Sequence, residues 1–294
     1  MPDTSPVIAK TVLVIGGVSP HIAVIERLKS LGFTTILADY KDAPPAAACA
    51  DRHLQISTLD ADAVLRAAQE LDVQAIVNVC LDQPLPVVAE VRARLGMVSP
   101  MSREAAHRLT DKDAMKQVLR AAGVDTARWT VAASPAALDL SGLTFPVVAK
   151  PVGGTGSLGV IFARDSGALA AQLDRSFAAA RGAGVLVEDF VEGQELSIDC
   201  IVIGGTVHVL LARERHKTWF SEGQEATCHA TVAPAVLSSQ IRALMETQAR
   251  AIAHAFAIHD GPMLIQSIMT PDGRLVVLEV AGRIGGGPGG NRVV

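Results

Sequence analysis

A lysine at the end of an apolar strand, followed directly by a glycine-rich loop, is the feature that most constrains this chain. The sequence VVAKPVGGTGSLGV covers residues 147–160 and leads into another apolar run, VIFA, instead of a helix. The glycines let backbone amides approach anionic oxygens closely, and Lys150 adds a point charge beside them. A P-loop would place its lysine after the glycines and before a helix. The segment therefore predicts a β-hairpin flap over a polyphosphate.

Two later segments favour a nucleotide site over the plain structural turn that a glycine-rich hairpin can also form. Residues 185–203 form an apolar strand interrupted by three glutamates, and residues 263–287 form two strands around a Pro-Asp-Gly turn. Gln266 and Glu279 are embedded in those two strands. A buried charge is costly unless it is paired or bound to a metal, and oxygen ligands suit magnesium. The alternative is that Gln266 bonds a backbone group while Glu279 pairs with Arg283.

The first hundred residues alternate between strand and helix patterns. Residues 10–101 contain three apolar strands, each followed by an amphipathic helix, and this βαβαβα order predicts a parallel sheet with helices on both faces. A helix is expected over Thr110–Ala122, with Thr110 or Asp111 as its N-cap and Gly123 as its stop. A further helix is expected near Ser238–Phe256.

Taken in this order, the segments resemble those of the ATP-grasp superfamily, and within it the carboxylate–amine ligases. These include D-alanine–D-alanine ligase, biotin carboxylase and the L-amino acid ligases. The resemblance runs from about Lys10 to the last residue. It implies a mixed α/β and α+β fold, with an N-terminal parallel α/β domain (1–101), a linker helix and small glycine-flap lobe (102–190), and a larger antiparallel lobe (191–294).

The resemblance also implies a nucleotide site. Two lysines and the flap would bind the phosphates, Glu188 would lie beside the adenine amino group, and Glu195 would bind the ribose hydroxyls. The backbone between these glutamates would form the hinge that contacts adenine. The implied ATP-binding residues are Lys112, Lys150, Gly153, Gly154, Thr155, Gly156, Ser157, Glu188, Phe190, Val191 and Glu195.

The same resemblance implies a divalent metal, Mg²⁺ or Mn²⁺, held by Gln266 and Glu279, with Arg283 reaching a phosphate or a substrate carboxylate. The chain departs from the family at this point. Many members carry asparagine two residues after the last metal glutamate, whereas Ala281 stands there in this sequence. One metal ligand is therefore missing, and the uncharged Gln266 lowers the negative charge of the site further.

The polar segment Arg213–Pro234 follows an apolar strand and shows too little periodicity for a core element. It predicts a loop that faces substrate. In that position, Arg213 and Lys217 could stabilise the charge on a transferring phosphate. The alternative is a solvated, charge-rich loop.

The function expected from the resemblance is an ATP-dependent carboxylate–amine ligase. It would form an amide or peptide bond through an acyl phosphate and release ADP and phosphate. Its substrates would be a small carboxylate and an amine, with amino acids favoured. Two alternatives stay open: a bicarbonate-using carboxylase or carbamoyl-phosphate-type enzyme, and a catalytically weak ATP-binding regulatory protein. The chain stops soon after Glu279, where relatives usually continue, so we expect either a truncated chain or a compact subfamily.

The composition of the chain argues against two classes of binding partner, nucleic acids and membranes. A net charge of −4 gives no basic footprint for nucleic acid, and no apolar stretch reaches the roughly eighteen residues of a membrane helix. The first ten residues lack the basic and apolar pattern of a secretory signal, which favours the cytoplasm. We allow for a homodimer, and we expect no nucleic acid or membrane partner.

Overall fold

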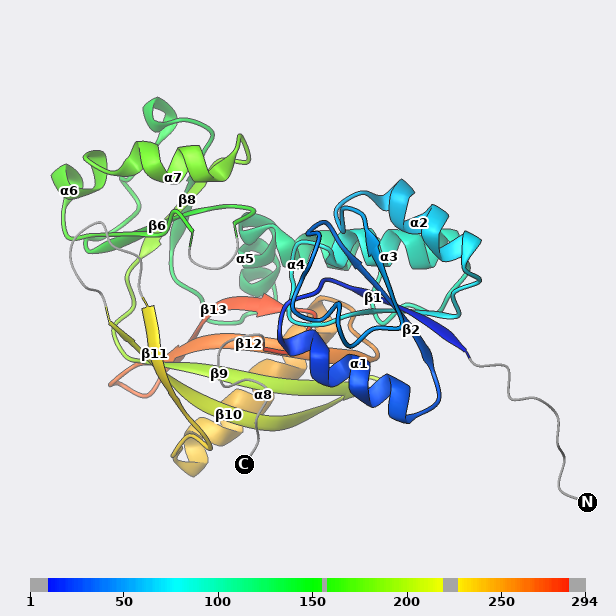
Figure 1. The fold of residues 1–294 in the computed structure, drawn as a ribbon. Coiled ribbons are helices and arrows are strands. Elements are labelled where there is room, and N and C mark those ends of the chain that lie inside the picture. Colours follow the sequence, from blue (N-terminus) through cyan, green and yellow to red (C-terminus); the bar gives the residue numbers. More distant parts are fainter. Residues whose placement is uncertain (1–9, 155–157, 219–226, 286–294) are drawn as a thin grey trace, which may run out of the picture. The chain divides into compact units, whose positions relative to one another are not determined.

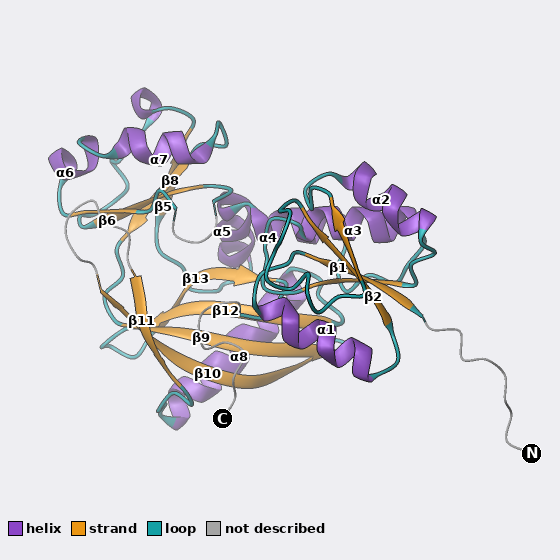
Figure 2. Cartoon of the chain, in the orientation of Figure 1, coloured by secondary structure: helices purple, strands orange, loops and turns teal. Residues whose placement is uncertain are grey.

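The computed structural model describes residues 10–154, 158–218 and 227–285. Thr155, Gly156 and Ser157, which were predicted to bind phosphate, lie outside these residues. The described chain forms two compact units, the first built from residues up to Arg103 and the second from Glu104–Ile284 (Figures 1 and 2). The first unit contains one sheet and the second contains two.

The first unit contains a four-stranded sheet in which all the strands are parallel. Its strand order is β3-β2-β1-β4. The elements are β1 (Thr11–Ile15), α1 (Pro20–Ser30), β2 (Thr34–Asp39), β3 (Arg52–Gln55), α2 (Ala61–Glu70), β4 (Ala75–Asn78) and α3 (Leu85–Arg94).

Alternate residues of β1 enter two separate hydrophobic clusters. Leu13 and Ile15 pack with residues of α2 and α3, whereas Val12 and Val14 pack with Ile25 of α1. Strands that are buried on both faces read as continuous apolar runs, which explains the sequence TVLVI. The predicted parallel sheet with helices on both faces is confirmed.

The strand β3 was not predicted. It is short, lies at the edge of the sheet and pairs only with β2 among the described strands. Its sequence, RHLQ, is mostly polar because one side of the strand has no neighbouring strand and its residues stay partly exposed. Apolar periodicity could not identify such a strand.

The second unit begins with two helices, α4 (Arg103–Thr110) and α5 (Lys112–Ala121). The side chain of Asp111 caps α5 by accepting hydrogen bonds from the backbone N–H groups of Asp113 and Ala114. Gly123 follows with a φ of 70°. The expected helix, its Asp111 cap and its glycine stop are therefore confirmed, whereas α4 was not predicted.

A four-stranded antiparallel sheet with the order β5-β8-β6-β7 follows. Strands β6 and β7 form the predicted hairpin around the glycine loop, with Val147 opposite Ala163. Helices α6 and α7 pack against this sheet and close a small apolar core. The elements are β5 (Trp129–Ala132), the short 3-10 helix η1 (Pro135–Ala137), β6 (Val147–Pro151), β7 (Ile161–Ala163), α6 (Ser166–Ala170), α7 (Leu173–Ala180) and β8 (Val185–Asp189).

The rest of the unit is a five-stranded antiparallel sheet with the order β11-β10-β9-β12-β13. The predicted helix near 238–256 is α8, which lies across one face of this sheet (Figure 1). The Gln248 side chain of α8 donates a hydrogen bond to the Leu275 carbonyl of β13 (2.8 Å). The elements are β9 (Gln194–Ile203), β10 (Thr206–Thr218), β11 (Thr227–Val232), α8 (Ser239–Ala255), β12 (Gly261–Met269) and β13 (Leu275–Ala281).

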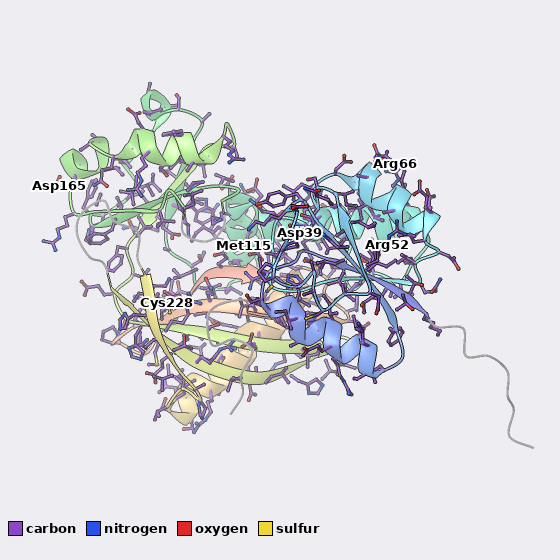
Figure 3. The ribbon with its side chains drawn as sticks, viewed as in Figure 1. Asp39, Arg52, Arg66, Met115, Asp165 and Cys228 are labelled. Carbon is purple, nitrogen blue, oxygen red and sulfur yellow. The ribbon has the colours of Figure 1, made fainter. Side chains whose placement is uncertain are left out.

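The predicted loop over Arg213–Pro234 is wrong for all its described residues except Ala233 and Pro234, because the others lie in strands. Residues up to Thr218 complete β10, and β11 begins at Thr227; Cys228, labelled in Figure 3, lies on this edge strand. The polar composition concealed the strand, because its charged residues pair with charged residues on β9 instead of with apolar neighbours.

The three-part division of the chain at residues 101 and 190 stays a prediction. No helix in the described parts of the chain has the length and apolar character that crossing a membrane requires.

Candidate functional site

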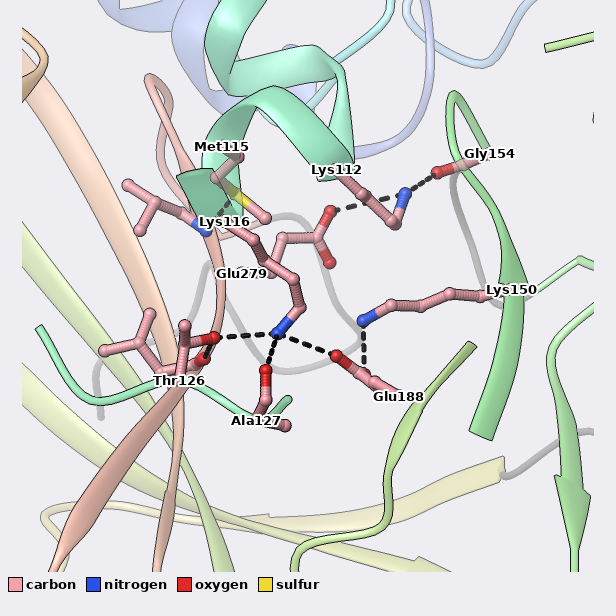
Figure 4. A network of polar contacts seen from close by, with 11 residues as sticks. Lys112, Met115, Lys116, Thr126, Ala127, Lys150, Gly154, Glu188 and Glu279 are labelled. Carbon is pink, nitrogen blue, oxygen red and sulfur yellow. Dashed lines mark hydrogen bonds and ion pairs between the residues drawn. The ribbon is translucent and has the colours of Figure 1, made fainter. Parts of the chain in front are cut away.

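A buried glutamate between two lysines forms the centre of the site. Glu188, at the end of β8, is 4% exposed. One carboxylate oxygen lies 2.6 Å from Lys150 Nζ of β6, and the other lies 2.8 Å from Lys116 Nζ of α5 (Figure 4). Strands β6 and β8 are adjacent, with Val148 opposite Glu188, so the sheet itself brings Lys150 to the carboxylate.

Charge pairing keeps Glu188 ionised. Burial by itself would raise the pKa of this carboxyl, but the charges of Lys150 and Lys116 lower the pKa below its usual value. Burial lowers the pKa of Lys116, and the charge of Glu188 opposes that shift. The stability of this cluster depends on all three charged groups, because removing one of them would leave a buried charge without its counter-ion.

Lys116 was missed from the sequence. Its ammonium also donates hydrogen bonds to the Thr126 hydroxyl (2.7 Å) and the Ala127 carbonyl (3.3 Å), and it lies 5.3 Å from the ring centroid of Trp129. The sequence did hold a signal. Lys112, Met115, Lys116 and Leu119 follow the spacing of one helix face, and all four are buried, so Lys116 occupies a core-facing position.

Thr126 joins this cluster to the large sheet. Its hydroxyl accepts from Lys116 and donates to the Val277 carbonyl of β13 (2.8 Å). The backbone N–H of Val277 donates to the Asp125 carbonyl (2.8 Å). The segment after α5 is thereby fixed along the strand that carries Glu279.

The large sheet presents a row of polar residues on the face opposite α8. Arg213 pairs with Ser197, Ser197 with Gln266, and Gln266 with Glu279, across four neighbouring strands. Residues that are opposite one another in a sheet share a face, so these four side chains lie on the same side. The intervening residues of β9, such as Leu196 and Ile198, are buried on the other side. One face of the sheet is therefore apolar and belongs to the core, and the other face carries the polar side chains of the candidate site.

Two ion-pair groups extend this polar face. Arg213 is buried and pairs with Asp199. Glu195 is 8% exposed, and its two oxygens lie 2.9 Å from Arg215 Nε and 2.6 Å from Lys217 Nζ. Arg213, Lys217 and Glu195 were predicted site residues, whereas Asp199 and Arg215 were not.

Lys112 bridges the glycine hairpin and the large sheet. Its ammonium donates a hydrogen bond to the Gly154 carbonyl and lies 3.9 Å from Glu279 Oε1 (Figure 4). The cluster of Lys112, Lys116, Lys150, Glu188 and Glu279 therefore carries three positive and two negative charges, a surplus that favours an anionic ligand.

The predicted hinge connects the two sheets of the unit. The N–H of Phe190 donates to the Pro146 carbonyl (2.9 Å), and the Phe190 ring meets Phe162 edge-on with centroids 5.0 Å apart. Val191 follows, and Gly193 packs so closely on Met269 that a Cβ atom would lie 2.3 Å from its carbonyl oxygen. Arg283 lies just beyond β13 and donates to the Ile284 carbonyl (3.0 Å).

The model of the ATP-grasp domain family matches residues 143–291, just over half of the 294 residues. The chain belongs to the ATP-grasp family. The match covers the glycine hairpin, β8, the hinge and all five strands of the large sheet, and these elements include those that carry Lys150, Glu188 and Glu279.

Related proteins agree with this assignment. The chain is 30% identical over 185 residues to phosphoribosylamine–glycine ligase of a Synechocystis species, an alignment that covers 58% of this chain and 43% of that enzyme. The L-amino acid ligase of Bacillus licheniformis has a similar fold, with a TM-score of 0.77 and 24% identity over 94% of this chain and 68% of that one. The biotin carboxylase domain of the Hydrogenobacter thermophilus 2-oxoglutarate carboxylase, solved with MgADP and bicarbonate, gives a TM-score of 0.78 and 19% identity over 94% and 64% of the two chains. The chain thus spans less than half of the length of the curated ligase.

The metal expected in an ATP-grasp protein fits these residues only in part. Gln266 and Glu279 lie opposite each other and offer an amide and a carboxylate oxygen. Among the described residues, no group of three His, Cys, Asp or Glu side chains could hold a metal ion. Mg²⁺ prefers six oxygen ligands and commonly takes some of them from substrate phosphates. The donor set therefore fits one cation shared with a polyphosphate, and it does not fit a site made by protein alone.

Proposed function

We propose that this ATP-grasp chain acts as an ATP-dependent carboxylate–amine ligase, forming an amide or peptide bond and releasing ADP and phosphate. The observation that carries the proposal is the surplus of positive charge at Lys112, Lys116 and Lys150, set between a glycine hairpin and a sheet face that bears Gln266 and Glu279. The similarity to a protein named phosphoribosylamine–glycine ligase also supports the proposal, because that name describes a ligase with glycine as a substrate.

In the proposed site, Lys112, Lys150 and the amides around Gly153 and Gly154 bind the phosphates. Glu188 accepts from the adenine amino group while Lys116 holds it in place. The backbone at Phe190 and Val191 contacts the adenine edge, and Glu195 binds the ribose. These roles follow from the resemblance and agree with the positions of the described residues.

The chemistry needs no protein nucleophile. A substrate carboxylate oxygen attacks the γ-phosphorus of ATP, the bond to the β–γ bridging oxygen breaks, and ADP leaves with an acyl phosphate remaining. An amine then attacks the acyl carbon, loses a proton, and expels phosphate. Gln266 and Glu279 would hold Mg²⁺ or Mn²⁺, which neutralises charge on the β- and γ-phosphates. Arg283, Lys217 and Arg213 would stabilise charge on the transferring group.

The substrates are proposed to be a small carboxylate and an amine, with amino acids favoured. The test incubates the chain with Mg²⁺, ATP and pooled amino acids, and follows both ADP release and product masses. ADP release with a product mass equal to two components minus water supports the ligase. ADP release that needs bicarbonate alone supports a carboxylase, and ATP binding without release supports a regulatory role.

A matched pair of variants ties turnover to the site. Glu279→Ala should abolish ADP release, because it removes the carboxylate proposed to hold the metal, whereas Glu246→Ala on the exposed side of α8 should leave it unchanged. Full turnover by Glu279→Ala would contradict the metal assignment. A homodimer and a cytoplasmic location stay predictions.

A further inference from the structure

Lys112 touches two parts of the proposed site at once. Its side chain is 10% exposed, and its ammonium is bonded to the Gly154 carbonyl and paired with Glu279 at 3.9 Å. The carboxylate of Glu279, which is 33% exposed, points toward this ammonium (Figure 4). The residue proposed to bind metal therefore already has a cationic partner within the protein.

The surroundings of Glu279 supply little negative charge besides its own. Gln266, its partner on β12, is neutral, and Ala281 follows two residues later on the same strand. Asp199, on the same face two strands away, is neutralised by Arg213. A divalent cation arriving at Glu279 would meet one carboxylate, one amide oxygen and the positive charge of Lys112.

A divalent cation and an ammonium group repel each other and compete for the same carboxylate. A nucleotide changes this balance, because its phosphate oxygens can pair with Lys112 and also complete the ligand set of the metal. Metal and nucleotide binding then strengthen each other, and the effect is reciprocal.

We propose that Lys112 is the counter-ion of Glu279 in the nucleotide-free protein, and that it makes divalent-cation binding depend on nucleotide binding. The inference rests on the proposed nucleotide and metal site, but it assigns to Lys112 a role beyond contacting phosphate. When a nucleotide phosphate pairs with Lys112, the carboxylate of Glu279 becomes able to bind the divalent cation.

The test measures Mn²⁺ binding by the loss of the electron paramagnetic resonance signal of free Mn²⁺, in the 294-residue chain without nucleotide. Lys112→Met should bind Mn²⁺ about tenfold more tightly than the unmodified chain, a coupling of ordinary size. Lys112→Arg keeps the charge and should bind Mn²⁺ as weakly as the unmodified chain. Lys41→Met, which alters a lysine beside Tyr40 in the other unit, is the matched control and should also leave Mn²⁺ binding unchanged.

A second measurement separates coupling from simple phosphate contact. ADP affinity is determined by calorimetry with and without Mn²⁺. The factor by which Mn²⁺ strengthens ADP binding should be about tenfold smaller in Lys112→Met than in the unmodified chain. Equal Mn²⁺ affinities in the unmodified chain and Lys112→Met, or an unchanged ADP ratio, would overturn the inference while leaving the nucleotide site intact. No ADP binding by the unmodified chain under either condition would overturn the proposed function as well.

Discussion

Replacing Glu188 by glutamine should destabilise the Glu104–Ile284 unit more than replacing Glu188 and Lys116 together. Glu188 neutralises two lysines, of which Lys116 has a fully buried side chain and Lys150 is 11% exposed. Glu188→Gln leaves both ammonium groups without their counter-charge. Breaking a buried ion pair by removing one partner costs about 3–5 kcal/mol.

The double variant Glu188→Gln/Lys116→Met removes the most deeply buried charge together with its partner. Exchanging a whole buried pair for neutral groups is often close to neutral in stability. Lys150 would remain, but its ammonium lies nearer to solvent. We therefore expect the double variant to recover roughly half or more of the stability lost in the single variant.

Differential scanning calorimetry is the suitable assay, because it can resolve the transitions of the two units. In a unit of this size, each kcal/mol shifts the melting temperature by about 2–4 °C, so Glu188→Gln should lower it by on the order of 10 °C. Trp129, whose ring centroid is 5.3 Å from Lys116 Nζ, gives a fluorescence check on the same transition. A single variant within about 1 kcal/mol of the unmodified chain, or a double variant no more stable than the single one, would refute the reasoning.

Three further predictions follow from local geometry. Thr126→Val should lose about 2 kcal/mol, because it removes a hydrogen bond to a buried ammonium and another to a strand carbonyl, whereas Thr126→Ser should retain most of that stability. The hydrogen bond from Lys29 is the largest cause that lowers the pKa of Asp51 to about 2, so this carboxylate stabilises the first unit above pH about 3.9 and loses that effect as the pH falls through about 2. Asp51→Asn should therefore flatten the acid limb of the melting-temperature profile between about pH 4 and 2. Gly193→Ala should cost at least about 2 kcal/mol, because φ is 149° and the new Cβ would lie 2.3 Å from the Met269 carbonyl.

Each of these expectations has a clear contrary result. Equal melting temperatures for Thr126→Val and Thr126→Ser would show that the hydroxyl contributes nothing. An acid limb that is unchanged in Asp51→Asn would assign the pH dependence to other carboxyls. A stable Gly193→Ala would mean that the connection between β8 and β9 can move away from Met269.

Much of the fold was predictable because its signals are local. The run TVLVI and the helices after it predicted a parallel sheet, and Asp111 and Gly123 marked both ends of α5. The Pro-Asp-Gly turn predicted the hairpin in which Gln266 and Glu279 are opposite each other. The turn sets the register near its own end of the hairpin, where Ser267 is opposite Val277, and a register shift between Gln266 and Ser267 then brings Gln266 opposite Glu279.

The parts that were missed depend on long-range contacts. Strand β3 has no apolar alternation, and residues 213–218 look like a polar loop until β9 supplies Glu195 and Asp199 as their partners. Lys116 resembles an ordinary helix lysine unless its position on the buried face of α5 is noticed. In each case the partner that explains the residue lies in another element of the chain.

The sequence by itself determined the glycine hairpin with Lys150, the helix that carries Lys112, and the strand pair that carries Glu279. These are set by backbone propensities, caps and turns that act over a few residues. Only the tertiary structure decided that Lys116 and Lys150 share Glu188, and that Lys112 faces Glu279. Those pairings join α5 to strands of two sheets, and they form because burying the apolar face of each element leaves the charged residues facing one another.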